Sequence, residues 1–126
     1  MIVRAQEGRK TETPHAREGK GTTFSRLLAG ERKGASLRAL AVHRLPAGAG
    51  WGPKAHPDLD EFYFILSGRA EVRDEDKIEP LEAGDFALVR AKDWSAIKNA
   101  GSEDLVFLSG LVNATRNVVD LKKFFG

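Results

Sequence analysis

Residues 48–68 read GAGWGPKAHPDLDEFYFILSG. This stretch opens with a Gly- and Pro-rich connection, turns again at Pro57, and ends at Ser67-Gly68. Aromatic and β-branched residues bounded by turn residues are typical of a strand, so we predict a β-strand over residues 61–66. The connection before it predicts a sharp change of chain direction.

The sequence on either side repeats this pattern of short strands and turns. Residues 36–45 alternate with a period of two, which places Leu37, Ala39, Ala41, His43 and Leu45 on one face of a strand. Further strands are predicted over residues 69–73, 86–89, 94–99 and 105–112. Only Leu27–Glu31 and Val118–Phe125 fit short helices. Many short strands separated by turns predict an all-β sandwich or closed barrel.

Composition limits the class of protein. The 126 residues suffice for one domain, residues 1–126, and the absence of Cys excludes disulfides and a thiol nucleophile. The net charge of +2 comes from scattered Lys and Arg residues, so we expect no nucleic-acid partner. No apolar run approaches the roughly 18 residues of a membrane span, and the polar start lacks a signal peptide. We therefore expect a cytoplasmic protein with no membrane partner.

A second stretch, residues 84–99, reads GDFALVRAKDWSAIKN. Both stretches resemble the paired motifs of the cupin superfamily. In the first motif, five residues separate a Gly from a His-any-His, three or four residues follow before a Glu, and six residues separate that Glu from a second Gly. Here the corresponding positions hold Gly48, Lys54-Ala55-His56, Glu61 and Gly68. The second motif aligns with Gly84, Arg90-Ala91-Lys92, Ser95 and Asn99.

The resemblance implies a small single-domain bacterial cupin, a jelly-roll (double-stranded β-helix) barrel of two antiparallel sheets. We expect the barrel core over residues 20–113, with a C-terminal tail. Residues 8–22 are rich in Gly, Pro and charge, and are predicted to form an arm or irregular lead-in.

The resemblance also implies a divalent metal, which cupins hold with three His and one Glu. The four positions here carry Lys54, His56, Glu61 and Ser95. An ammonium cannot ligate a metal and a serine hydroxyl is a poor ligand, so we expect no metal. If one is bound, it is a single Zn, Ni, Fe or Mn ion at His56 and Glu61, with His43 as a substitute ligand. Lys54→His combined with Ser95→His is expected to restore a site.

The same positions predict a polar pocket. Residues two apart on a strand share a face, so Lys54 and His56 are expected on one face of their strand, and Glu61 and Tyr63 on one face of the next strand. We predict that Lys54, His56, Glu61, Tyr63 and Ser95 bind a small molecule. Each of these residues also has a purely structural interpretation. Lys54 and Glu61 would form an ion pair, and His43 would be a hydrogen-bonded core residue.

Two functions remain open at this point. The first is a small-molecule-binding protein with an incomplete metal site. The second is an enzyme of isomerase, lyase or dioxygenase type acting on a sugar or keto acid, with His56 or Glu61 as acid–base and Lys54 holding an anionic group. A metal-dependent form of that enzyme would use His43.

Several apolar residues point away from this pocket. Phe62, Phe64 and Leu66 form the opposite face of their strand, so we predict a homodimer that covers them, the alternative being cover by the N-terminal segment. Trp51 is predicted either to cover the barrel mouth or to anchor the surface. Trp94 is expected to point away from Ser95.

Overall fold

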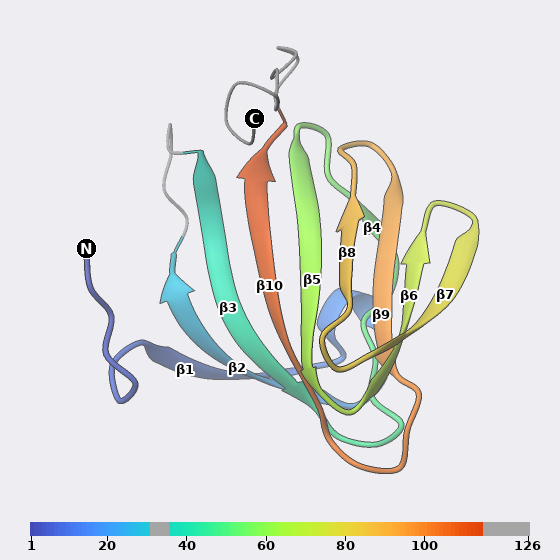
Figure 1. The fold of residues 1–126 in the computed structure, drawn as a ribbon, viewed down its shortest axis with the longest axis horizontal. Coiled ribbons are helices and arrows are strands. Elements are labelled where there is room, and N and C mark those ends of the chain that lie inside the picture. The colour runs from blue at the N-terminus through green and yellow to red at the C-terminus, as the bar shows by residue number, and fades with distance from the viewer. Residues whose placement is uncertain (31–35, 115–126) are drawn as a thin grey trace.

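Turn residues divide the chain into short strands that alternate between inward and outward side chains. The computed structural model describes residues 1–30 and 36–114, which form ten strands and one turn of 3₁₀ helix (Figure 1). The elements are β1 (Arg9–Pro14), η1 (Ala16–Glu18), β2 (Thr22–Ala29), β3 (Leu37–Leu45), β4 (Lys54–Ala55), β5 (Leu59–Ser67), β6 (Arg69–Asp74), β7 (Lys77–Glu82), β8 (Phe86–Val89), β9 (Trp94–Asn99) and β10 (Leu105–Asn113).

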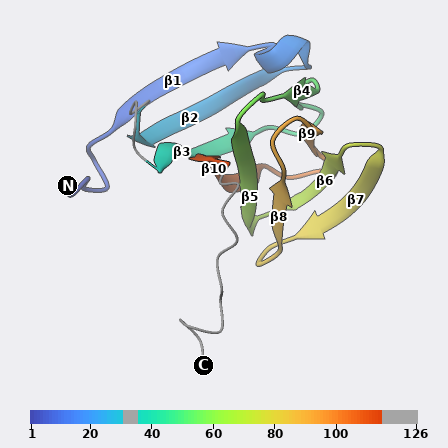
Figure 2. The ribbon, with the colours of Figure 1, turned by 90° about the horizontal axis from the view of Figure 1, so that it is seen from above.

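The strands form two antiparallel sheets, as predicted for a jelly roll. One has the order β1-β2-β3-β10-β5-β8 and the other β4-β9-β6-β7. In Figure 2, β1 and β2 lie on the opposite side of the molecule from β6 and β7. Within the described residues, strand pairing does not join the two sheets into one closed barrel. Side chains from both sheets fill the space between them, and those below 2% exposure include Leu45, Tyr63, Ile65, Val89, Ile97, Leu105 and Phe107.

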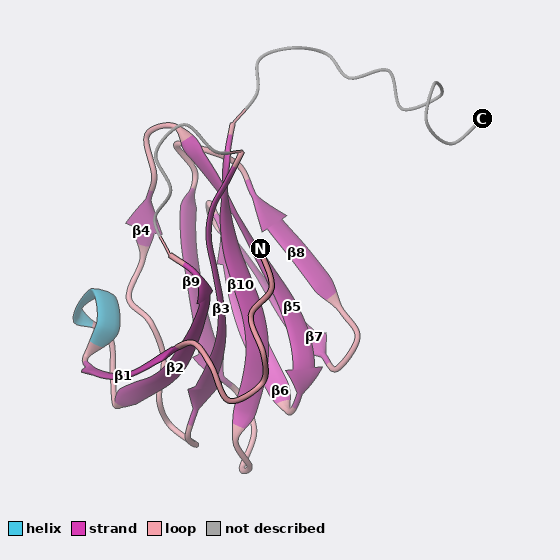
Figure 3. Ribbon diagram, turned by 90° about the vertical axis from the view of Figure 1, so that its left-hand side faces the viewer, coloured by secondary structure: helices cyan, strands magenta, loops and turns pink. Residues whose placement is uncertain are grey.

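The N-terminal segment differs from the prediction. Residues 9–14 are not an irregular arm but strand β1, which pairs with β2 in the register Thr11↔Ser25. The chain then turns through η1, which Figure 3 shows beside the ends of β1 and β2. A short helix over Leu27–Glu31 is also wrong, because β2 runs through Ala29 and its inward side chains pack against the other strands. The second predicted helix, Val118–Phe125, lies outside the described residues.

The outer face of the six-stranded sheet is apolar around β5 and β8. Phe62 packs beside Phe86 with ring centroids 5.9 Å apart, and a side chain at Gly110 would overlap the Phe62 ring. Phe86, Leu66 and Leu88 are 59%, 46% and 40% exposed. Among the described strands, β1 pairs with β2 alone, at the far edge of the sheet from β5 and β8, and so does not cover this face. Among the described residues, no helix is long and apolar enough to cross a membrane.

Candidate functional site

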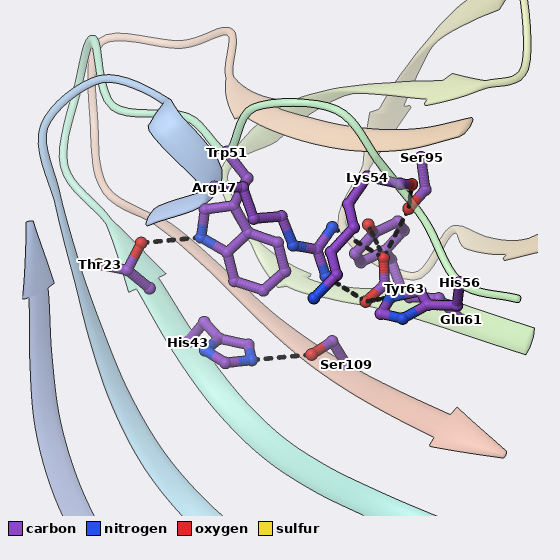
Figure 4. A network of polar contacts seen from close by, with 10 residues as sticks. All are labelled: Arg17, Thr23, His43, Trp51, Lys54, His56, Glu61, Tyr63, Ser95 and Ser109. Carbon is purple, nitrogen blue, oxygen red and sulfur yellow. Dashed lines mark hydrogen bonds and ion pairs between the residues drawn. The ribbon is translucent and has the colours of Figure 1, made fainter. Parts of the chain in front are cut away.

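The two sequence motifs meet between the sheets. Strand β4 pairs with β9 in the register Lys54↔Ser95, so these two residues are direct neighbours. The alternation of β5 turns Glu61 and Tyr63 inward, and both are buried, as are Ser95 and His56. Lys54 is the exposed member of the group. The five residues predicted to bind a ligand therefore lie around one position (Figure 4).

Glu61 is the centre of this arrangement. Its Oε1 atom accepts hydrogen bonds from the Tyr63 hydroxyl at 2.5 Å and the Ser95 hydroxyl at 2.7 Å. Glu61 is 3% exposed, so its carboxylate depends on protein donors rather than on water.

The cation that balances Glu61 is Arg17, not Lys54. The guanidinium donates to Oε1 at 3.0 Å and to Oε2 at 2.5 Å, a two-point contact that a lysine ammonium cannot make. Lys54 forms no side-chain hydrogen bond or ion pair with the described part of the chain, so the expected Lys54–Glu61 pair is wrong. Figure 4 shows its side chain extending in the direction of the Arg17–Glu61 pair.

Arg17 is held by its surroundings. Its guanidinium carbon lies 4.6 Å from the centroid of the Trp51 ring, within cation–π range. The indole nitrogen donates to the Thr23 hydroxyl at 2.7 Å, which fixes the ring. Trp51 thus forms an inner wall of the site, neither a cover of the mouth nor a surface anchor. Trp94 is 45% exposed and points away from the site, as predicted.

The backbone that delivers Arg17 is strained. His15, Arg17 and Glu18 have φ values of 51°, 54° and 60°, in the left-handed region that costs a residue with a side chain about 1–2 kcal/mol. At Gly52 a side chain would overlap the Arg17 carbonyl oxygen. A Gly is therefore required where the Trp51 connection passes the η1 turn.

These contacts fix the protonation states of the pair. Burial alone would raise the pKa of Glu61, but the neighbouring His56, Arg17 and Tyr63 outweigh burial and hold that pKa far below its usual range. Burial and the Glu61 charge raise the pKa of Tyr63 well above its usual value. Burial would lower the pKa of Arg17, yet the Glu61 carboxylate raises it. These shifts favour a charged carboxylate, a charged guanidinium and a neutral phenol at neutral pH.

His56 is the buried side chain in this group with unused hydrogen-bonding capacity. Its Nε2 atom lies 3.6 Å from Glu61 Oε2, longer than a hydrogen bond, and has no partner in the described structure. A buried ring nitrogen without a partner is unfavourable, so this atom favours an added hydrogen-bonding group.

His43 also points between the sheets, but its ring is satisfied. Nδ1 is hydrogen-bonded to Ser25 Oγ at 2.6 Å and Nε2 to Ser109 Oγ at 2.7 Å. Burial lowers the pKa of His43 to about 4. It is a hydrogen-bonded core residue, the plainer of the two interpretations made from the sequence.

The donor set does not fit the divalent metal that the cupin resemblance implies. Arg17 engages both oxygens of Glu61, Lys54 and Ser95 stand at two of the ligand positions, and both His43 nitrogens are occupied. Within residues 1–30 and 36–114, no three His, Asp or Glu side chains are grouped to hold a metal, so the His43–His56–Glu61 alternative is not formed. The guanidinium supplies the positive charge that Glu61 requires.

Beside Arg17 lies a cavity of about 200 Å³. Its wall includes Arg17, His43, Trp51, Glu61 and Ser109 together with apolar residues of β2, β3 and β10. Of the five residues predicted to bind a ligand, only Glu61 lines this cavity, and Arg17 lines it beside Glu61.

Sequence reasoning missed Arg17 and the role of Trp51. Arg17 is 44 residues from Glu61 in the chain and lies in a segment without strand or helix periodicity. One physical signal was available: a buried Glu61 without a metal needs a cation that can satisfy both its oxygens, and only arginine has that fork geometry. The sequence contains many basic residues, and only the three-dimensional structure shows that Arg17 is the one that reaches Glu61.

Comparison with known proteins agrees with this fold. The family described as "Cupin domain" matches residues 41–110, more than half of the chain. No curated protein matches the sequence. A predicted oxalate decarboxylase from Thermotoga maritima has a similar structure, with 31% identity, a TM-score of 0.81, and coverage of 90% of this chain and 99% of that chain.

Two further structures share the fold at lower identity. A conserved protein of unknown function from Streptococcus pyogenes is 24% identical, with a TM-score of 0.63 over 74% of this chain and 75% of that chain. A cupin domain from Schizosaccharomyces pombe is 16% identical, with a TM-score of 0.63 over 95% of each chain. With the family match over residues 41–110 and the 31% identical structure, the chain belongs to the cupin family.

Proposed function

We propose that this cupin binds a small carboxylate without a metal, at the Arg17–Glu61 pair between the sheets. The observation that carries the proposal is the balance of hydrogen-bonding capacity. Arginine has five N–H donors, and Glu61 takes only two of those of Arg17. The Glu61 oxygens, in contrast, already accept from three side chains.

The hydrogen-bonding groups that remain unused in the site are therefore donors. Lys54 adds an exposed ammonium, and His56 adds a buried Nε2 that has no hydrogen-bond partner in the described structure and can donate. A ligand that complements this group must accept hydrogen bonds and carry negative charge. A carboxylate satisfies both conditions, whereas a sugar hydroxyl satisfies only the first.

One of the similar structures gives independent support. It is named a predicted oxalate decarboxylase, and oxalate is a small dicarboxylate. Its name concerns that protein, but the ligand class is the one that the donor-rich site of this chain favours. Keto acids, predicted above as one substrate class, also carry a carboxylate.

Thermal unfolding with added ligands tests the proposal. Pyruvate at millimolar concentration should raise the melting temperature, because a ligand that binds the native state stabilises it by RT ln(1 + [L]/Kd). Pyruvamide, which keeps the shape of pyruvate without its charge, should leave it unchanged. Chelator should not alter either result. Equal effects of pyruvate and pyruvamide, or one tightly held metal per chain by elemental analysis, would overturn the proposal.

Lys54→Gln provides a matched variant. It should weaken pyruvate binding several-fold while the fold stays intact, since Lys54 is exposed. Lys77→Gln removes the same charge from the exposed β6–β7 hairpin and should bind pyruvate as the parent does. Equal weakening in both variants would indicate a general charge effect rather than a site.

An enzyme that acts on a keto acid is the second candidate. His56 is the acid–base group that we propose for it, because the surroundings lower the pKa of Glu61 and raise that of Tyr63 away from neutral pH. Exchange of the pyruvate methyl protons with deuterium, followed by NMR, should then depend on His56. If no exchange is seen, the enzyme candidate is contradicted and binding is the remaining proposed function. A cytoplasmic location and the lack of a nucleic-acid partner stay predictions.

A further inference from the structure

The cavity beside Arg17 has an apolar part formed by three strands. The residues concerned are Leu27 of β2, Ala39, Leu40 and Ala41 of β3, and Leu111 of β10. Ala39 is the register partner of Leu111, and Ala41 is that of Leu27. Two alanines at neighbouring inward positions of β3 leave space that larger side chains would fill.

The polar side chains on this wall have their hydrogen bonds already made. His43 Nε2 and Ser109 Oγ are bonded to each other, and the second His43 nitrogen is bonded to Ser25. Glu61 is saturated by Arg17, Tyr63 and Ser95. A polar or charged group placed deep in the cavity would lose its water and gain few partners, which is unfavourable.

The size of the cavity sets the size of the group that fits. A cavity of about 150 Å³ lined by apolar side chains holds one benzene molecule. The volume of about 200 Å³ beside Arg17 therefore accommodates an apolar group of similar or slightly larger size, with the carboxylate left at the guanidinium.

We propose that the ligand is an amphipathic monocarboxylate, with a short apolar chain or ring of roughly four to six carbon atoms in the cavity whose wall includes Ala39 and Leu111. The inference rests on the proposed carboxylate site and deepens it. It favours a monocarboxylate with an apolar end over oxalate and other short dicarboxylates, because a second charge would be buried without a partner.

A chain-length series tests the inference in the parent protein. Calorimetric titration with acetate, butanoate, hexanoate and decanoate should show affinity rising by up to about fourfold per added methylene, the gain expected for burying each CH₂. The rise should stop near hexanoate, where the cavity is full, so that decanoate gains nothing further. Succinate should bind more weakly than butanoate, which has the same number of carbons.

A cavity-filling variant provides the second arm. Ala39→Leu should weaken hexanoate binding by at least tenfold and change acetate binding by less than twofold. Ala96→Leu makes the same change on β9, where the neighbouring Ser95 and Ile97 point inward, and should bind both ligands as the parent does. If Ala39→Leu fails to fold, the chain-length series decides alone.

The outcomes separate the two proposals. No binding of acetate, butanoate or hexanoate contradicts the carboxylate site itself. Binding of all three with equal affinity, or a loss of hexanoate affinity no larger than that of acetate in Ala39→Leu, contradicts the apolar cavity and leaves the carboxylate site standing. Rising affinity that Ala39→Leu selectively removes supports both.

Discussion

At the level of single residues, the buried Arg17–Glu61 pair makes two charges depend on each other. Arg17→Met should lower the free energy of unfolding by about 3–5 kcal/mol, because it leaves the Glu61 carboxylate buried without its cation. Adding Glu61→Gln should recover much of that loss. Urea denaturation of the parent, both single variants and the double variant measures the coupling. Arg69→Met, which breaks a fully exposed pair with Glu82, should cost under about 1 kcal/mol.

Arg17 also changes what is needed to restore a metal site. From the motif alone, Lys54→His with Ser95→His should suffice, but the guanidinium occupies both Glu61 oxygens. We now expect that double variant to bind Ni²⁺ no better than the parent. The triple variant that adds Arg17→Ala should bind at least tenfold more tightly, because it frees the carboxylate and removes a positive charge. Tight Ni²⁺ binding by the double variant in calorimetric titration would contradict the guanidinium's role.

His43 should make stability depend on pH in a defined window. Its pKa is lowered to about 4 in the folded protein, with Glu61 and Arg17 as the charged groups facing it, against about 6.5 when unfolded. The unfolded chain binds the extra proton between these values, so stability should fall as the pH drops from 6.5 to 4, by at most about 1.4 kcal/mol per pH unit. Glu61 adds a further loss only below about pH 4.3, where its unfolded form takes up a proton. His43→Gln should flatten the upper window in denaturation curves, and a pH dependence equal to that of the parent in this variant would contradict the role of His43.

At the level of elements, the η1 turn and the connection before β4 position the site together. Gly52→Ala should displace the Arg17 backbone, because the added methyl group overlaps the Arg17 carbonyl oxygen. We expect a loss of about 1–3 kcal/mol in the free energy of unfolding and weaker carboxylate binding. Gly101→Ala is the control, since its added methyl would meet Arg69 at an ordinary 3.6 Å. A Gly52→Ala protein with parental stability would show that the turn adjusts freely.

The sequence predicted some elements well because their signals are local. Alternation in residues 36–45 and the aromatic run at 61–66 reflect which face is buried, and the motif spacing placed Lys54, His56, Glu61 and Ser95 together. Strand β1 and the η1 turn could not be predicted in this way. Strand β1 is exposed on both faces, and its sequence does not alternate between apolar and polar residues. Arg17 has a left-handed backbone conformation, which the sequence would have signalled only if the residue were a Gly. Their conformations follow from contacts with β2 and with the connection at residues 50–52, which only the fold creates.

At the level of the whole molecule, the outer face of the six-stranded sheet raises the question of assembly. Phe86 and Leu88 of β8 lie opposite Phe64 and Phe62 of β5, so the apolar surface is wider than the single strand considered from the sequence. The exposed fractions of Phe86, Leu66 and Leu88 make this surface unfavourable in water. β1 lies at the other edge of the sheet, so cover by the N-terminal segment is wrong.

A second copy of the chain is the occupant we expect, because two identical apolar faces can cover each other around a two-fold axis. Light scattering at micromolar concentration should give twice the 13.8 kDa mass of one chain. Phe86→Glu places a charge in the centre of the contact and should shift the protein to a monomer with its fold retained. Ile78→Glu is the matched control, since Ile78 is equally exposed, at 60%, but lies on β7 of the other sheet. A monomeric parent contradicts the prediction, and a Phe86→Glu protein that stays dimeric places the contact on a different face.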